Sequence, residues 1–210
     1  MIYEEGNNLR MVQRLVDDIR AALDNDLYFV ALSTALTLPD ICGKAAYPRL
    51  STTNRYKKWY NKEIGRYEKN PHQASKEEMP YLSSEVIYSL RCSLLHEGNP
   101  NLNNPKLTNK NASLPIDHFV LKTEKKNEFD IYSDSSSVSD FGQYKREYTM
   151  SIRRICLIIC CVAEDYYKDN KEKFHFNYEI LDWDKATENL PPIDMDAVME
   201  ALADPNLGNT

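Results

Sequence analysis

A run of nine consecutive apolar residues, Ile155–Ala163, constrains the fold of this chain more than any other feature. A helix that spans a membrane needs about 20 such residues, so this run is too short to cross one. It lies inside a segment, about residues 143–169, whose pattern predicts a helix. Because the run is apolar on every side, we expect it to form the central, most buried helix of a bundle.

The N-terminal part of the chain predicts helices that pack around this run. Apolar side chains recur at helical spacing over residues 8–24, and a second helix follows from about Leu27. Pro39 must kink or restart that second helix, and Gly43 followed by Pro48 marks its end. Because the link between the two helices is short, we expect an antiparallel helical hairpin.

Two further helices are predicted before the middle of the chain. The first, over residues 52–69, carries a stripe of aromatic residues beside a stripe of basic ones. The second, over residues 83–97, has Ser83 or Ser84 available as its N-cap and Gly98 as its stop signal. The predicted fold class is therefore mainly α, an antiparallel helical bundle.

A small β insertion is predicted at about residues 116–133. Two short strands, His118–Thr123 and Glu128–Tyr132, are expected to form a hairpin through a turn at Glu124–Asn127. The serine-rich segment Asp134–Asp140 that follows predicts a loop.

Charge divides the chain unevenly. The net charge is −6, but the last 32 residues carry −7 and the rest sum to +1. We expect a helical domain over residues 1–180, closing with an edge strand at Phe174–Ile180. An acidic C-terminal appendage over residues 181–210, with a short helix at 194–203, is expected to add little to the core. A nearly neutral body with basic patches does not exclude a polyanionic partner.

The cysteines and the first residues bear on the cellular compartment. The five cysteines are odd in number and show no C-x-x-C spacing, which is typical of reduced thiols. Residues 1–10 lack the apolar core of a secretory signal. We therefore expect a cytoplasmic protein that does not associate with a membrane.

The segment Leu90–Gly98 holds the residues best suited to chemistry. The four histidines show no metal-ligand spacing, and no motif for a nucleotide cofactor or a nucleophilic hydrolase is present, so we expect no metal and no cofactor. Arg91 and His96 lie five residues apart, about 140° around a helix axis. A histidine can move protons at a ribose hydroxyl, and an arginine can hold a phosphate.

The Arg-x4-His spacing late in an internal helix resembles the motif of the HEPN superfamily. The likeness covers roughly residues 8–170 by helix order. It implies a metal-independent endoribonuclease of bacterial toxin–antitoxin or phage-defence type, with Arg91 and His96 as catalytic residues. It also implies a homodimer with RNA as substrate and a cognate antitoxin or other protein as partner.

Several other residues are candidates for supporting roles. Ser93, Glu97 and Asp40 are expected to support the Arg91–His96 pair, with Asp40 orienting a catalytic group. The basic stripe of the helix predicted over residues 52–69 supplies candidates for RNA binding. They would contact phosphates while bases stack on the aromatic stripe, and they are Arg55, Lys58, Lys62 and Arg66.

Structural interpretations of the same residues stay open. His96 can be a C-terminal cap with Arg91 in a surface ion pair, and Asp40 can cap the helix that resumes after Pro39. The aromatic stripe can belong to the core. The alternative function is a non-catalytic HEPN-like module that binds a protein partner or RNA.

Overall fold

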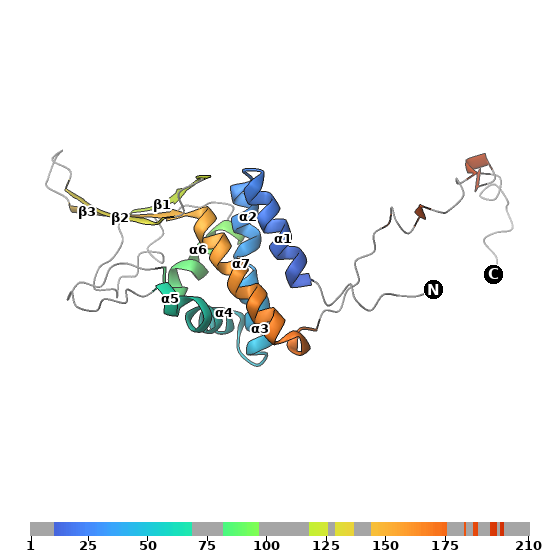
Figure 1. Cartoon of the computed structure of the whole chain (residues 1–210), viewed down its shortest axis with the longest axis horizontal. Helices are drawn as coiled ribbons and strands as arrows, with labels where there is room; N and C mark the ends of the chain where they lie inside the picture. Colours follow the sequence, from blue (N-terminus) through green and yellow to red (C-terminus); the bar gives the residue numbers. More distant parts are fainter. Residues whose placement is uncertain are drawn as a thin grey trace. The chain divides into compact units, whose positions relative to one another are not determined.

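The structure is a computed structural model in which residues 11–68, 82–96, 118–125, 129–136 and 144–175 are described, with residues 183, 187–188, 194–196 and 198–199. The chain divides into two compact units, residues 1–177 and 178–210, and each is treated by itself. The first unit is mostly helical and contains a small sheet (Figure 1). The predicted mainly α class is confirmed at this level.

The first helices follow the predicted pattern. Helix α1 spans Met11–Asp24 and contacts α2, Tyr28–Ala35, across a short turn. In that turn Asp26 adopts a left-handed conformation, with a φ of 60°. Helix α3 spans Leu38–Ala46 and carries Pro39 in its first turn, where the missing backbone N–H costs no helical hydrogen bond. The restart predicted at this proline is therefore correct.

The single helix predicted over residues 52–69 is divided into three pieces. Helix α4, Thr52–Tyr60, continues into a π-helical turn, η2, Asn61–Gly65, and then into the short α5, Arg66–Glu68. After a stretch outside the described residues, α6 spans Ser84–His96. The Ser83 hydroxyl accepts the backbone N–H of Val86 at 3.3 Å, so Ser83 rather than Ser84 supplies this cap contact.

The last long helix, α7, is shorter than predicted. It spans Ile152–Asp169, and the eight residues before it, Tyr144–Ser151, form strand β3. The prediction of a helix from residue 143 was wrong here because period-2 alternation, with Tyr148 and Met150 buried, directly precedes the helical pattern. Ser151 ends the strand and caps the helix, its hydroxyl accepting the N–H of Arg154 at 3.2 Å.

The sheet has the order β1-β3-β2, where β1 spans His118–Lys122 and β2 spans Ile131–Ser136. Strand β1 pairs parallel with β3, and β2 pairs antiparallel with it. The predicted hairpin between the first two strands was therefore wrong, since β3 lies between them. The loop predicted at Asp134–Asp140 was also wrong at its first three residues, which belong to β2. Both errors follow from missing β3, which supplies the hydrogen-bonding partner for both strands.

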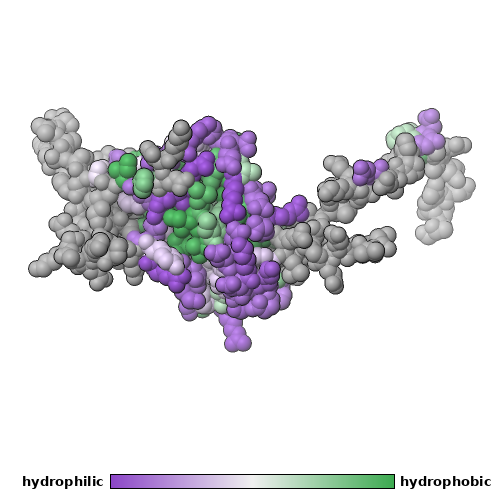
Figure 2. All heavy atoms as spheres, viewed as in Figure 1, coloured by the Kyte–Doolittle hydropathy of each residue, from purple (hydrophilic) through white to green (hydrophobic). Residues whose placement is uncertain are grey.

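Helix α7 is central but buried on one side only. It packs against α1, α2, α3 and η2. On its outer face Cys161 is exposed and Leu157, Ile158 and Val162 are partly buried. Figure 2 shows an apolar area over α7 bordered by hydrophilic residues. The apolar character of this run on every side therefore does not correspond to burial on every side.

The aromatic stripe of the third predicted helix belongs to the core. The Tyr56 ring meets the edge of Tyr88 on α6, with centroids 5.2 Å apart, and Trp59 meets Tyr166 on α7 at 5.7 Å. Only Tyr67 is exposed. Most of the stripe is therefore not available to stack on bases. Its fully buried aromatic members are Tyr56, Trp59 and Tyr60, and Ile64 beside them is fully buried as well.

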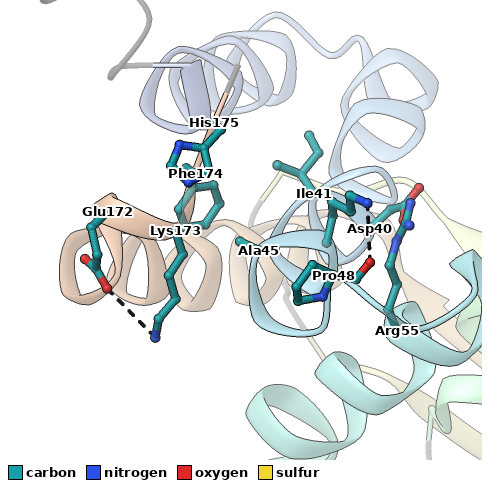
Figure 3. A pocket seen from close by; sticks show the side chains of 10 residues that line it. Asp40, Ile41, Ala45, Pro48, Arg55, Glu172, Lys173, Phe174 and His175 are labelled. Atoms are coloured by element: carbon teal, nitrogen blue, oxygen red, sulfur yellow. Dashed lines mark hydrogen bonds and ion pairs between the residues drawn. The ribbon is translucent and has the colours of Figure 1, made fainter. Parts of the chain in front are cut away.

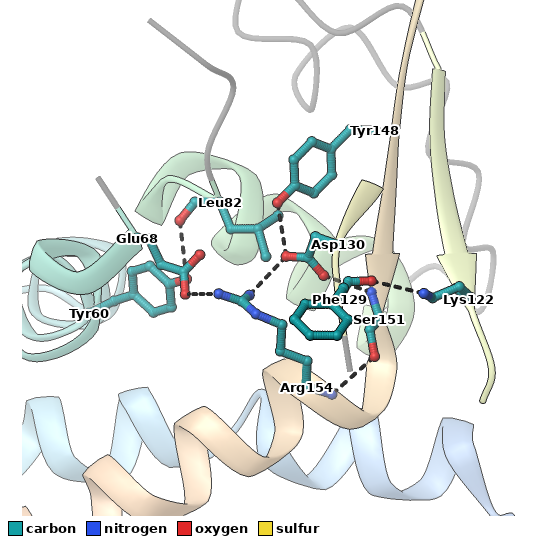
Figure 4. A network of polar contacts seen from close by, with 9 residues as sticks. All are labelled: Tyr60, Glu68, Leu82, Lys122, Phe129, Asp130, Tyr148, Ser151 and Arg154. Carbon is teal, nitrogen blue, oxygen red and sulfur yellow. Dashed lines mark hydrogen bonds and ion pairs between the residues drawn. The ribbon is translucent and has the colours of Figure 1, made fainter. Parts of the chain in front are cut away.

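A polar network joins the sheet to the helices (Figure 4). The Arg154 guanidinium at the start of α7 donates to Glu68 of α5 and to Asp130, both at 2.8 Å. Asp130 also accepts the hydroxyl of Tyr148 and the backbone N–H of Ser151, both at 2.9 Å. Burial, with the nearby Asp130 carboxylate, raises the pKa of Tyr148. The network fixes the register between β3, the segment before β2 and the helical layer.

The C-terminal predictions are only partly covered by the described residues. After α7 a short 3₁₀ helix, η3, spans Lys171–Lys173. Phe174 and His175 are not in a strand, and the rest of the edge strand predicted at Phe174–Ile180 lies outside the described residues. In the second unit the N–H of Val198 donates to the carbonyl of Asp194 at 3.0 Å, a helical contact within the predicted helix at 194–203.

Gly43 allows α3 and α4 to approach closely. A Cβ at this position would lie 2.9 Å from the carbonyl oxygen and 3.1 Å from the carbonyl carbon of Arg55, both backbone atoms that cannot easily move. We expect Gly43→Ala to lower the free energy of unfolding by about 1–3 kcal/mol, the usual cost of overpacking, measured by urea denaturation.

Gly65→Ala is the matched control. Its Cβ would meet the flexible Asn61 side chain at 3.3 Å, and alanine is the better helix former. We expect a change within about 0.5–1 kcal/mol. Equal stability of the Gly43 variant and the wild type would show that the two helices are not packed as closely as described.

Candidate functional site

Asp40 is the centre of a charged cluster that joins three helices. Its Oδ1 accepts a hydrogen bond from Nε of Arg55 on α4 at 2.8 Å. Its Oδ2 lies 3.6 Å from Nη2 of Arg91 on α6, an ion pair slightly longer than a hydrogen bond. The side chains of Asp40, Arg55 and Arg91 are 19%, 17% and 14% exposed. We call these three residues the Asp40 cluster.

The local sequence explains how the cluster assembles. Pro39 sets the first turn of α3, which carries Asp40, and an acid is favoured there by the helix dipole. Gly43, one turn later, lets the backbone of Arg55 come close enough for its guanidinium to reach the carboxylate. The cluster is therefore built by a proline and a glycine that control how two helices meet.

Arg91 lies among aromatic rings. Its guanidinium carbon is 5.9 Å from the ring centroids of both Tyr56 and Tyr88, within cation–π range. The Tyr88 ring is itself fixed by a hydroxyl contact of 2.7 Å to Thr53. Burial raises the pKa of Tyr56 and the nearby Arg91 charge opposes that rise, so the phenol stays neutral. These contacts hold the guanidinium in one orientation.

Two buried polar atoms in this region have no hydrogen-bond partner among the described residues. They are Nε of Arg91 and the hydroxyl of Tyr56. A buried donor without a partner is uncommon in folded proteins and calls for an explanation. The Asp40 cluster has two guanidiniums and one carboxylate, so it keeps one net positive charge. Such an arrangement can hold a phosphate group.

The structure describes only some of the other residues of the predicted catalytic group. His96 is the last residue of α6, and its side chain, like Glu97, lies outside the described residues. Ser93 is buried, with 2% of its surface exposed, so it lies in the core and not at a surface where it could contact a substrate. Asp40 does contact Arg91, although 51 residues separate them in the sequence.

The predicted basic stripe does not form one continuous surface of unpaired charges. Arg55 turns inward to Asp40, as described above. The ammonium of Lys58 lies 4.5 Å from the centroid of the Tyr47 ring, and its side chain is exposed. Of these two candidates for RNA binding, Lys58 is exposed, whereas Arg55 is only 17% exposed and is paired with Asp40.

The other two candidates for RNA binding, Lys62 and Arg66, line a groove of about 470 Å³ between η2, α5 and α7. Lys62 forms an ion pair with Glu63 at 3.1 Å, and Arg66 lies over the ring of Tyr67 at 4.6 Å. Because these cations already have partners, they are weaker candidates for phosphate contacts than the helical pattern suggested.

A groove of about 580 Å³ opens beside the Asp40 cluster (Figure 3). Asp40 and Arg55 lie on one side of it, and Lys173 and His175 come from the segment that follows α7. Lys44, one turn after Asp40 on the same face of α3, also lines it. The spacing of Asp40 and Lys44 could have indicated this face, whereas no sequence signal brings His175 to it.

Comparisons with protein-family models, with curated protein sequences and with solved structures find no match to this chain. Within the described residues, no group of three or more histidine, cysteine, aspartate or glutamate side chains could hold a metal ion. None of the helices in this described part of the chain has both the length and the hydropathy that a membrane span requires.

Removing the Asp40 carboxylate should destabilise the protein. In Asp40→Ala the two largely buried arginine side chains lose their shared counter-charge and repel each other. We expect the free energy of unfolding to fall by about 2–4 kcal/mol, as for other largely buried ion pairs that lose one partner. Chemical denaturation monitored by circular dichroism measures this change.

Asp165→Ala is the control for this substitution. Its carboxylate is 79% exposed and lies 3.7 Å from Lys168 on the same helix, so we expect a change of at most about 0.5 kcal/mol. An Asp40→Ala protein as stable as the wild type would mean that the carboxylate does not hold the two arginines together.

Proposed function

We propose that this protein is a metal-independent endoribonuclease in which Arg91 holds the phosphate of the scissile bond and His96 transfers protons. One observation carries the proposal: the Arg91 guanidinium is oriented by Asp40 and two tyrosine rings, while its buried Nε lacks a partner among the described residues. A donor held in place before the substrate arrives costs little reorganisation when charge develops on a phosphate.

The reaction needs only proton transfer and charge stabilisation. The ribose 2′-hydroxyl loses its proton and its oxygen bonds to phosphorus, while the bond from phosphorus to the 5′-oxygen breaks and that oxygen gains a proton. His96, in the last turn of α6, is the residue proposed to accept or donate a proton in these steps. Arg91 offsets the negative charge that develops on the phosphate oxygens.

The resemblance of Arg91 and His96 to the HEPN motif supports the same proposal, an endoribonuclease. It adds a second copy of the chain, since in that superfamily the motif helices of two protomers face one cleft. The proposal therefore includes a homodimer in which α6 lies near the interface. A bacterial toxin–antitoxin or phage-defence role, a cytoplasmic location and a cognate protein partner are further parts of the proposal.

A second candidate function is a non-catalytic module that binds RNA or a protein. The observation that favours it is the low exposure of Arg91, 14%, together with its ion pair to Asp40. Both suit a residue that joins α6 to α3. The two candidates differ in whether RNA is cleaved, so one assay separates them.

We expect the purified protein to cleave single-stranded RNA in the presence of EDTA, leaving a 2′,3′-cyclic phosphate and a 5′-hydroxyl. Arg91→Ala should lower the cleavage rate about 10²- to 10³-fold through lost charge stabilisation. His96→Ala should lower it about 10²- to 10⁴-fold through lost proton transfer. Product ends are identified by mass spectrometry and rates by single-turnover kinetics.

Arg49→Ala is the control, because Arg49 is an exposed arginine outside the Asp40 cluster. Its rate should stay within about twofold of the wild type, as for a surface side chain without a role. Cleavage that survives both the Arg91 and His96 substitutions would place the active site elsewhere. A folded wild type that cleaves no RNA would favour the binding module.

A further inference from the structure

The groove beside the Asp40 cluster takes no part in the cleavage step proposed above. Its lining comes from α3, from the link between α3 and α4, from the first part of α4, and from η3 with the two residues that follow it (Figure 3). Asp40 directs one carboxylate oxygen to Arg55, which lines the groove, and the other to Arg91. One carboxylate of the groove lining therefore contacts both Arg55 and the Arg91 guanidinium.

Part of the lining is apolar and rigid. Phe174 is nearly buried, and the edge contact with Tyr167, at a centroid distance of 5.0 Å, holds its ring in place. The volume, about 580 Å³, falls within the range of roughly 300–1,000 Å³ that small-ligand sites occupy. A flat, weakly polar ring such as a nucleobase suits a surface of this kind. The apolar lining residues are Ile41, Ala45, Pro48 and Phe174.

The polar part of the lining has an excess of positive charge. The Asp40 carboxylate is neutralised by two arginines, and Glu172 lies 3.9 Å from Lys173. The ammonium of Lys44 contacts the carbonyl of Pro48 at 3.4 Å and has no carboxylate partner in the described part of the chain. Its charge is therefore available to an anion in the groove that Arg55 also lines.

We propose that this groove binds one nucleotide unit, with the base on the apolar lining and the phosphate against Lys44 and Arg55. The exposed imidazole of His175 adds a polar or stacking contact to the base. This inference rests on the proposed action on RNA, for which the groove supplies a subsite next to the phosphate that Arg91 holds. The ligand is a nucleoside monophosphate, either free or as one unit of an RNA strand.

Binding of two ligands that cannot be cleaved by 2′-hydroxyl attack tests the proposal. Adenosine 5′-monophosphate represents the free source and a 2′-O-methyl hexanucleotide the strand, each titrated by calorimetry against the full-length protein. Lys44→Glu should weaken binding about tenfold or more, because a charge-assisted contact is replaced by repulsion. Lys44 is exposed, so the fold should tolerate the change, and Lys44→Gln is a milder second variant.

Arg14→Glu is the matched control. It makes the same change in charge at an exposed position of α1 that does not line the groove, so affinity should stay within about twofold.

Lys44→Ala should also reduce the steepness of the salt dependence of hexanucleotide binding by about one unit of slope, the value for one lost phosphate contact.

The outcomes separate the sources of the ligand. Lys44-dependent binding of the monophosphate and the hexanucleotide supports the subsite, and binding of the hexanucleotide alone assigns it to a strand. Equal affinity in the wild type and Lys44→Glu overturns the proposal. The proposal is also overturned if inorganic phosphate displaces the hexanucleotide as effectively as the monophosphate does. The same holds for an oligoglutamate peptide, and that result would indicate that the groove binds an acidic protein. A protein that binds these ligands through Lys44 but cleaves no RNA would contradict the ribonuclease and leave the subsite intact.

Discussion

The carboxylate of Asp40 is shared by two guanidiniums that reach it from different helices. Without it, Arg55 and Arg91 would be two like charges, both more than four-fifths buried, at the junction of α3, α4 and α6. Burying such charges is costly unless they are paired. The junction therefore depends on one acidic side chain, and so does the orientation of Arg91. The same carboxylate forms part of the groove lining, so a ligand there and a phosphate at Arg91 would both respond to its position.

Arg91 can be interpreted as a structural link between helices or as a functional residue. The two interpretations differ in how they explain its hydrogen-bond donor that lacks a partner. An arginine that only joins helices is expected to have all its N–H groups paired, because an unpaired buried donor costs about 1–3 kcal/mol. Nε of Arg91 has no partner among the described residues, and the tyrosine rings beside it supply no acceptor as strong as a carbonyl or carboxylate. The proposed function accounts for the fixed guanidinium by placing a phosphate against the part of the side chain that is exposed.

Much of the helical part could be predicted from the sequence because it is locally encoded. A proline after a turn favours the start of a new helix, as Pro39 does for α3. Ser83 likewise caps the helix that holds Arg91. Strand β3 was missed because its alternation around Tyr148 is short and runs without a turn into α7. The π-helical turn at Asn61–Gly65 was missed as well, because its sequence continues a helical pattern.

The candidate site could be predicted only in part, since it is assembled by tertiary contacts. The Arg91–His96 spacing is visible on one helix, and Asp40 could be suspected only as a general supporting acid. Nothing local shows that Arg55 points inward to Asp40, or that His175 comes to the same groove from the far end of α7. The burial of Ser93 likewise depends on which face of α6 meets its neighbours.

The central claim is that the side chain of Arg91 meets the phosphate backbone directly, and the nuclear magnetic resonance signal of its Nε–H group tests this most directly. The signal is identified by its loss in Arg91→Lys and then followed as the 2′-O-methyl hexanucleotide is added to nitrogen-15-labelled protein. The account predicts that it shifts and saturates over the concentrations at which the hexanucleotide binds. A hexanucleotide that binds while the Arg91 signal stays unmoved would contradict the account and leave Arg91 as a structural link between helices.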